Sequence, residues 1–230
     1  MNNRFLCQAK VIGNGQRKLS IVKVAVVGVG GTGCNVVLLL AQLGVKNVKL
    51  IDSDVVELCN LARQPLFNEK DIGRPKVKVA VEKLSSYGAK FTSVQQFLDA
   101  SNVSKLLKDV DVVLDCTDNY EARKNINAFC MKNKTPWIYS GAIRDNVMVS
   151  TFVPSRKDFE CFAKPLQEVS CCEDGVLATS TSVAAVLQVR EFLNLINKKP
   201  LLVGKVLYFN LSNFSLSFFP LKKARGSCKK

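Results

Sequence analysis

The sequence predicts an α/β protein with a Rossmann-like, doubly wound and mostly parallel sheet that ends in antiparallel C-terminal strands. Three observations support this prediction. Short apolar runs rich in β-branched residues alternate with segments of helical periodicity, as in a parallel sheet covered by helices. A glycine-rich segment directly follows the first apolar run and opens the first helical segment. Beyond Gly141 the regular alternation is lost and strand patterns predominate.

Each expected element follows from a local pattern. Residues 23–28 (KVAVVG) are a β-branched apolar run bounded by glycine, which predicts a buried strand. Residues 31–43 carry valine and leucine at helical spacing, and residues 75–87 form a helix with Pro75 in its first turn. The remaining strands are expected at residues 47–52, 90–97, 110–116, 136–140 and 146–153, the remaining helices at 102–108, 120–133 and 178–196, and a closing hairpin at 205–210 and 214–219.

The domain organisation is predicted from length and composition. The chain has 230 residues, of which 47% are hydrophobic, so we expect residues 1–230 to form a single domain. Residues 1–22 are expected to form an N-terminal arm. Residues 154–177 hold two prolines and three cysteines without a period, which predicts a long crossover loop at the active site.

The composition excludes several classes of site. The chain has no histidine, so it can hold neither a Ser-His-Asp triad nor a histidine-ligated metal. No apolar run reaches about 18 residues, and the first residues lack the apolar core of a signal peptide, so we expect a cytoplasmic protein without a membrane span. Nine scattered cysteines, an odd number, predict reduced thiols.

The net charge of +14 is concentrated at the two ends of the chain. Residues 1–23 and 221–230 hold ten basic and no acidic residues, so the body between them carries only +4. Basic ends on a nearly neutral body are typical of solvated tails, and we expect no nucleic-acid partner.

A nucleotide site is predicted where the first strand ends. Residues 28–33 (GVGGTG) match G-x-G-x-x-G between a strand and a helix, the context in which this motif binds phosphates. Asp52 ends the second strand, where a carboxylate accepts hydrogen bonds from ribose hydroxyls. This pattern alone does not choose between a dinucleotide and ATP. The glycines assigned to the site are Gly28, Gly30, Gly31 and Gly33.

Polar and charged residues after the later strands favour ATP. In an open α/β sheet such residues share the ligand-binding edge. Arg63 can fork onto phosphate oxygens, Lys76 supplies a point charge, and Asp118 can hold Mg²⁺ against phosphates. A nicotinamide dehydrogenase needs no such set. The assigned residues are Asp54, Asn60, Arg63, Gln64, Lys76, Asp118 and Asn119.

These motifs together resemble a known family. GVGGTG, D-x-D, N-L-x-R-Q, G-R-P-K and D-C-T-D-N are similar to the ubiquitin-activating-enzyme-like adenylyltransferases of molybdopterin and thiamin biosynthesis, the ThiF type, over about residues 4–228. By this resemblance Asp52 would bind the ATP ribose, and Asn60, Arg63 and Lys76 would contact its phosphates. Asp118 would coordinate Mg²⁺, the metal that the resemblance implies.

The resemblance also implies an activity and partners. The family adenylates the C-terminal glycine carboxylate of a small ubiquitin-like or sulfur-carrier protein that ends in Gly-Gly, and it releases pyrophosphate. An ionised carboxylate needs no general base, so catalysis would depend on positioning and charge neutralisation by Arg63, Lys76 and Asp118. We therefore expect ATP and Mg²⁺ as ligands, a carrier protein as partner, and a homodimer.

The cysteines divide into groups by this resemblance. Cys171 matches the family's loop cysteine, which attacks the acyl-adenylate or carries sulfur in some members; Cys172, or a spectator thiol, is the alternative. Relatives bind zinc through two C-x-x-C pairs, of which this chain keeps only Cys161 and Cys228, so we expect no zinc and retain these two as weak candidates. The cysteines expected in the core are Cys34, Cys59, Cys116 and Cys130.

One departure from the family pattern leaves alternatives open. Relatives begin Arg-aromatic-x-Arg-Gln, and this chain keeps Arg4 but has Cys7 in place of the second arginine. Arg4 or another basic residue of the N-terminal arm could replace it; otherwise the ATP site is weakened, or the cation comes from a different subunit.

Three other functions remain as alternatives. They are adenylation of a peptide C-terminus or a modified tRNA base, a non-catalytic partner subunit of an active homologue, and a Rossmann dehydrogenase.

Overall fold

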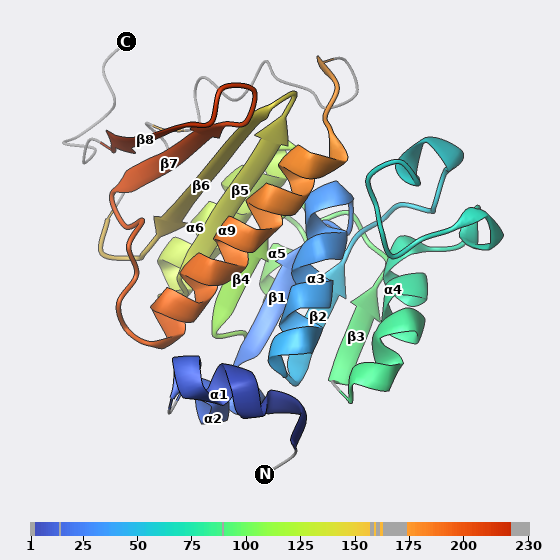
Figure 1. Cartoon of the computed structure of the whole chain (residues 1–230), viewed down its shortest axis with the longest axis horizontal. Helices are drawn as coiled ribbons and strands as arrows, with labels where there is room; N and C mark the ends of the chain where they lie inside the picture. Colours follow the sequence, from blue (N-terminus) through green and yellow to red (C-terminus); the bar gives the residue numbers. More distant parts are fainter. Residues whose placement is uncertain are drawn as a thin grey trace.

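A computed structural model describes residues 3–13, 15–88, 90–156, 159, 162 and 174–221. Its eight-stranded sheet has the order β3-β2-β1-β4-β5-β6-β7-β8 (Figure 1). The first five strands in this order are parallel, and the last three follow antiparallel, which confirms the predicted fold class. The strands are β1 (Lys23–Val27), β2 (Asn47–Ile51), β3 (Lys90–Val94), β4 (Val112–Asp115), β5 (Trp137–Ile143), β6 (Asn146–Phe152), β7 (Lys205–Asn210) and β8 (Ser215–Pro220).

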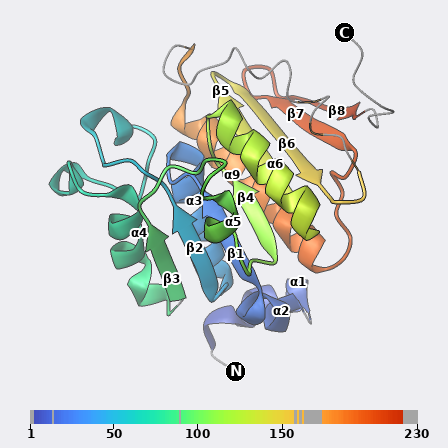
Figure 2. The same ribbon diagram turned by 180° about the vertical axis from the view of Figure 1, so that it is seen from behind.

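Helices cover both faces of the parallel part of the sheet (Figures 1 and 2). Leu40 and Phe192 are fully buried in the core on one face, and Ile126 and Trp137 in the core on the other. The first face is covered by α3 (Gly31–Leu43), α4 (Lys76–Leu84) and α9 (Ala178–Ile196), and the second by α5 (Val103–Leu106) and α6 (Tyr120–Asn133). Because β1 is buried on both faces, it is continuously apolar, as its sequence predicts.

Several predicted elements are shorter than expected. The helix predicted at residues 75–87 ends at Leu84 and continues as a 3-10 turn, Ser85–Tyr87, before Gly88 adopts a left-handed φ of 72°. The strand predicted at residues 90–97 ends at Val94. Gln96, Phe97 and Leu98 beyond it lie outside the strand, at the edge where the parallel strands end.

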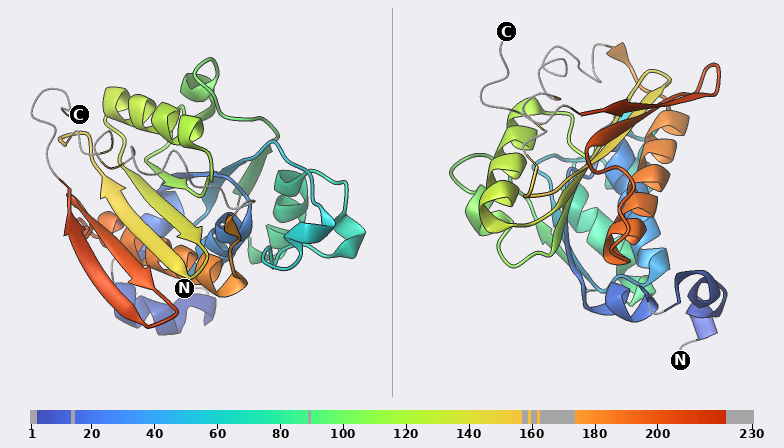
Figure 3. Two further views of the ribbon diagram at one scale, coloured as in Figure 1. Left: turned by 90° about the horizontal axis from the view of Figure 1, so that it is seen from above. Right: turned by 90° about the vertical axis from the view of Figure 1, so that its left-hand side faces the viewer.

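The N-terminal arm contains two short helices that the sequence analysis did not assign, α1 (Leu6–Ile12) and α2 (Gly15–Ile21). They lie below the starts of the parallel strands (Figures 1 and 3). The Gln8 and Gln16 side-chain amides both donate hydrogen bonds to the Leu43 carbonyl, at 2.9 and 3.0 Å. Lys18 Nζ donates to the Ile196 carbonyl at 3.2 Å. The helices therefore cap the C-terminal ends of α3 and α9, whose last carbonyls lack partners within the helix.

Candidate functional site

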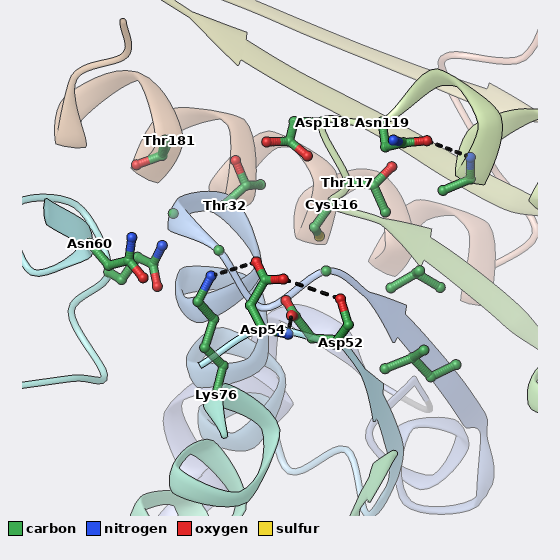
Figure 4. A pocket seen from close by; sticks show the side chains of 18 of the residues that line it. Thr32, Asp52, Asp54, Asn60, Lys76, Cys116, Thr117, Asp118, Asn119 and Thr181 are labelled. Carbon is green, nitrogen blue, oxygen red and sulfur yellow. Dashed lines mark hydrogen bonds and ion pairs between the residues drawn. The ribbon is translucent and has the colours of Figure 1, made fainter. Parts of the chain in front are cut away.

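A cavity of about 340 Å³ opens at the edge where β1, β2, β3 and β4 end (Figure 4). This is the edge at which ligands bind in doubly wound folds. Of the predicted site residues, those that line the cavity are Gly28, Gly30, Gly31, Asp52, Asp54, Asn60, Arg63, Gln64, Lys76, Asp118 and Asn119. Gly33 does not line it.

The glycine-rich loop needs glycine at two positions for different reasons. Gly28 has a φ of 90°, and a Cβ there would lie 2.7 Å from the Cys116 carbonyl oxygen. Gly33 lies in the first turn of α3, where a Cβ would lie 2.0 Å from the Gly28 carbonyl oxygen. Both glycines therefore allow β1, α3 and the loop after β4 to pack closely.

The Asp52 carboxylate hydrogen-bonds to the backbone of the glycine-rich loop and of the segment after β2. Its Oδ2 accepts a hydrogen bond from the Val29 amide at 2.6 Å, and its Oδ1 accepts one from the Asp54 amide at 2.8 Å. Burial raises the pKa of this carboxyl, although the hydrogen bonds from the two backbone amides and the positive charge of Lys76 act to lower it. The carboxylate is thus fixed in orientation and keeps lone pairs for hydroxyl donors within the cavity.

Two cationic side chains reach the cavity after β2: Arg63 comes from the segment between β2 and α4, and Lys76 is the first residue of α4. Lys76 is 6% exposed, and its Nζ pairs with Asp54 Oδ2 at 2.9 Å (Figure 4). Arg63 is half-buried, and its Nη1 donates to the Cys59 carbonyl at 3.1 Å. A buried ammonium and a half-buried guanidinium at one edge are suited to phosphate oxygens.

Two buried amide side chains also line the cavity. Asn60 is 5% exposed, and its Oδ1 accepts a hydrogen bond from the Glu57 amide at 3.1 Å. Gln64 is 3% exposed, and its Oε1 has no hydrogen-bond partner among the described residues. A buried polar atom without a partner at a cavity wall indicates a ligand or water that satisfies it.

The loop after β4 brings Asp118 to the opposite wall (Figure 4). Asn119 caps α6 through its Oδ1, which accepts a hydrogen bond from the Ala122 amide at 3.0 Å. Among the described residues no cluster of three or more Cys, Asp or Glu side chains could hold a metal ion. Mg²⁺ with nucleotides often takes only one or two protein carboxylates, so Asp118 alone fits that chemistry.

The predicted cysteine groups are partly tested. Cys34 and Cys130 are buried as predicted, and burial raises the pKa of both thiols. The prediction for Cys59 was wrong: it is exposed and lines the cavity, because it lies in the short 3-10 turn Leu58–Asn60 rather than in a core element. Cys116 is only half-buried and also lines the cavity. Cys161, Cys171, Cys172 and Cys228 lie outside the described residues.

Several cavity residues were not predicted. Thr181 comes from α9, and it approaches the glycine loop so closely that a Cβ on Gly31 would lie 2.8 Å from its Cγ2. Phe97 follows β3. Arg123, in the first turn of α6, was expected at the ligand-binding edge but was not assigned to the site. No local sequence signal identifies Thr181, because its position depends on how α9 packs against α3.

The fold and the cavity together define a Rossmann-type protein with a glycine-loop site for a nucleotide. The chain belongs to the ThiF family, whose model matches residues 4–230, and this confirms the predicted resemblance. Among the described residues no helix is both long and apolar enough to cross a membrane.

Characterised relatives agree with this assignment. The chain is 35% identical over 189 residues to the molybdopterin-synthase adenylyltransferase of Escherichia coli K12, covering 80% of this chain and 76% of the relative. It is 32% identical over 219 residues to the sulfur carrier protein ThiS adenylyltransferase of the same organism, covering 93% and 87%. The structure of Escherichia coli MccB with ATP matches with a TM-score of 0.87, at 22% identity, over 99% of this chain and 74% of that one, which supports the fold.

Proposed function

We propose that this protein uses ATP to adenylate the C-terminal glycine carboxylate of a small ubiquitin-like or sulfur-carrier protein, with release of pyrophosphate. The observation that carries the proposal is the single cavity shared by the glycine loop, Asp52, Arg63, Lys76 and Asp118. The names of its relatives, which are adenylyltransferases of molybdopterin synthase and of a sulfur carrier, support the same activity.

The residues present fit ATP as a substrate. Asp52 would accept hydrogen bonds from ribose hydroxyls, since its carboxylate is already oriented by two backbone amides. At Gly30 the backbone is open, because the nearest atom to a Cβ there would be Gln64 Nε2 at 4.0 Å. The polyphosphate would lie against this open backbone, and Gln64 and Asn119 would line its site.

Charge neutralisation would come from Arg63, from Lys76 and from a magnesium ion held by Asp118. Asn60, Arg63 and Lys76 would contact phosphate oxygens, with Asp54 keeping the Lys76 ammonium at the cavity wall through their 2.9 Å ion pair. Asp118 would hold Mg²⁺, which when bound neutralises phosphate charge and orients the leaving group. Arg63, Lys76 and Asp118 are the proposed catalytic residues.

The proposed reaction needs no general base. An oxygen of the ionised glycine carboxylate forms a bond to the α-phosphorus of ATP. The bond from that phosphorus to the oxygen bridging to the β-phosphate breaks, and the electron pair leaves with pyrophosphate. No proton moves, which is consistent with a chain that contains no histidine. The cations stabilise charge on the phosphate oxygens as these bonds change.

The wider context is proposed on the same basis. We propose that the protein works as a cytoplasmic homodimer, as its resemblance to the family implies. Cys171 would act only after the adenylate has formed. Its thiolate would attack the acyl carbon to form a thioester while AMP leaves, or a persulfide loaded on it by an external sulfur donor would attack the same carbon, again with loss of AMP. A Cys171→Ala variant is therefore expected to keep adenylate formation and to lose only a later transfer.

The test is exchange of labelled pyrophosphate into ATP in the presence of each small protein of the same genome that ends in Gly-Gly. We expect exchange that depends on one such carrier, on its terminal carboxylate and on Mg²⁺. A carrier shortened by its last glycine is the matched control and should support no exchange. Absence of exchange with every carrier would overturn the proposal.

A further inference from the structure

We infer that Arg123 is a positioning residue that holds Asp118 in place for magnesium-bound ATP. The inference rests on the proposed function, in which Asp118 is a magnesium ligand. It is carried by a buried network directly beneath the loop between β4 and α6, whose members are Asp115, Thr117, Arg123 and Tyr139.

The loop that carries Asp118 is fixed from its strand side. Asp115 ends β4 and is fully buried. Its Oδ1 accepts hydrogen bonds from the Thr117 amide at 3.0 Å and from the Thr117 hydroxyl at 2.7 Å. The Cys116 amide donates to the Val27 carbonyl at 2.8 Å, which ties the same loop to β1. These bonds determine the path of the chain up to Thr117, the residue before Asp118.

Arg123, in the helix that follows the loop, contacts both Thr117 and Asp115. Its Nη2 donates a hydrogen bond to the Thr117 carbonyl, and its Nε lies 3.5 Å from Asp115 Oδ2. Its guanidinium carbon lies 5.0 Å from the centre of the Tyr139 ring on β5. One planar side chain thus links the strand end, the peptide adjoining Asp118 and the neighbouring strand. The bound carbonyl belongs to the peptide group whose nitrogen is that of Asp118.

Stability alone does not account for this network. Asp115 is 0% exposed and Arg123 7% exposed. A buried ion pair loses hydration on both partners, and well-packed apolar residues often give equal or greater stability in its place. Such a pair does specify one arrangement of the chain, because a displaced loop would leave a buried charge without its partner. The arrangement specified here is the one that points Asp118 into the cavity (Figure 4).

The geometry requires arginine rather than any cation. The forked guanidinium reaches the Asp115 carboxylate and the Thr117 carbonyl with different nitrogen atoms. A lysine would keep the positive charge but present a single point donor on a flexible stem. The substitution Arg123→Lys therefore removes the forked donor that positions the loop but keeps the positive charge.

The first experiment compares Arg123→Lys with the wild-type protein in carrier-dependent pyrophosphate exchange. Groups that orient a metal ligand typically change metal affinity by about 10- to 100-fold when altered. We expect the free Mg²⁺ concentration for half-maximal exchange, and that for half-maximal equilibrium binding of ATP without the carrier, each to rise about tenfold, with little change in the KM for ATP at saturating Mg²⁺. Arg190→Lys, the same substitution at an exposed position on α9, is the matched control and should leave these values unchanged.

The second experiment is a double-variant cycle with Asp118→Asn, and it separates this inference from the proposed function. If Arg123 acts through Asp118, Arg123→Lys should add little further loss of exchange to the Asp118→Asn variant. Unchanged exchange in Asp118→Asn itself would instead refute the magnesium role in the proposed function. Equal fold losses from Arg123→Lys in both backgrounds would overturn the positioning role.

Two further outcomes are decisive. A rise in the KM for ATP without a change in magnesium dependence would assign Arg123 a direct contact with the nucleotide and overturn the inference. If Arg123→Lys does not fold, Thr117→Val breaks the same network at its hydroxyl and should shift magnesium dependence in the same direction, by a smaller factor. No shift in a folded Thr117→Val variant would then contradict the inference.

Discussion

The parallel and antiparallel parts of the sheet differ in what lies at their strand ends. The parallel part contains β1, β2, β3 and β4, which run in one direction. The residues that follow these strands therefore meet at one edge of the sheet, where they line the cavity. β6, β7 and β8 alternate in direction, and none of the described residues that line the cavity belongs to them. The edge strand β8 instead exposes the apolar side chains of Leu216, Phe218 and Phe219. Because of this difference in strand direction, the cavity-lining residues come from the parallel part, and we expect the antiparallel part to contribute mainly to stability.

This comparison predicts that Asp118→Ala, in the parallel part, has the largest effect on activity. Loss of the proposed magnesium ligand should lower the rate of adenylate formation by at least about 100-fold. The loop is held by Asp115, Asn119 and Arg123, so folding should be retained. Glu121→Ala removes an exposed carboxylate three residues further on, outside the cavity, and serves as the control. Single-turnover formation of the adenylate is the measurement, and equal rates in the two variants would contradict the account.

Lys76→Met should have the next largest effect. It removes a buried ammonium from the cavity wall but preserves the length of the side chain. We expect kcat/KM for ATP to fall about 10- to 100-fold, the typical effect of losing a hydrogen bond to a charged group. Lys78→Met on the exposed face of the same helix is the matched control. A similar loss in both variants would point to net charge rather than to a specific contact.

Gly30→Ala tests the open backbone of the glycine loop, with a smaller expected effect. Gly30 has a φ of −84°, which alanine adopts without strain, so the melting temperature should stay near that of the wild type. The added methyl group would project into the space proposed for phosphate, and the KM for ATP should rise. Gly33→Ala, by contrast, should lower the melting temperature, because its Cβ would collide with the Gly28 carbonyl oxygen. Unchanged ATP kinetics in Gly30→Ala would contradict the proposed position of the phosphates.

The antiparallel part should show the reverse behaviour. Val149 on β6 is fully buried, and Val149→Ala should lower the free energy of unfolding by about 2 kcal/mol. Because β6 contributes nothing to the described cavity wall, KM and kcat for the folded fraction should not change. Denaturant titration and exchange kinetics on the same preparation measure both quantities. A selective loss of activity at full stability would remove the distinction between the two parts.

The smallest expected effect is on thermal stability, and it comes from Asp71, a buried carboxylate in the parallel part that does not line the cavity. Burial alone would raise the pKa of Asp71, but hydrogen bonds from Lys83 and the Asn68 amide, with the charges of Lys83 and Arg74, lower it on balance. A carboxyl with a lowered pKa stabilises the fold above its usual titration range, and this contribution is lost as the pH falls through the folded-state pKa. Asp71→Asn should therefore melt below the wild type at pH 7. The difference should narrow below about pH 4, and a constant difference would assign the effect to packing.

Sequence reasoning succeeded where strand ends determine position. The glycine loop, Asp52 and Asp118 each follow a strongly apolar strand, so topology alone brings them to one edge. It missed α1 and α2, because their stability depends on Gln8, Gln16 and Lys18 capping helices far away in the sequence.

Residues positioned by packing between distant elements could not be predicted from local patterns. Thr181 enters the cavity only because α9 crosses α3. Cys59 is exposed because its turn contributes no residue to the core on either side. The buried pair of Arg123 and Asp115 has only an ordinary helical arginine as its sequence signal.

The most direct test of the central claim is the intact mass of the carrier protein after incubation with this protein, ATP and Mg²⁺. The account predicts a carrier heavier by one adenylyl group at its terminal carboxylate, formed by the wild-type protein and absent with Asp118→Ala. An unmodified carrier under conditions in which the wild-type protein binds ATP would contradict it.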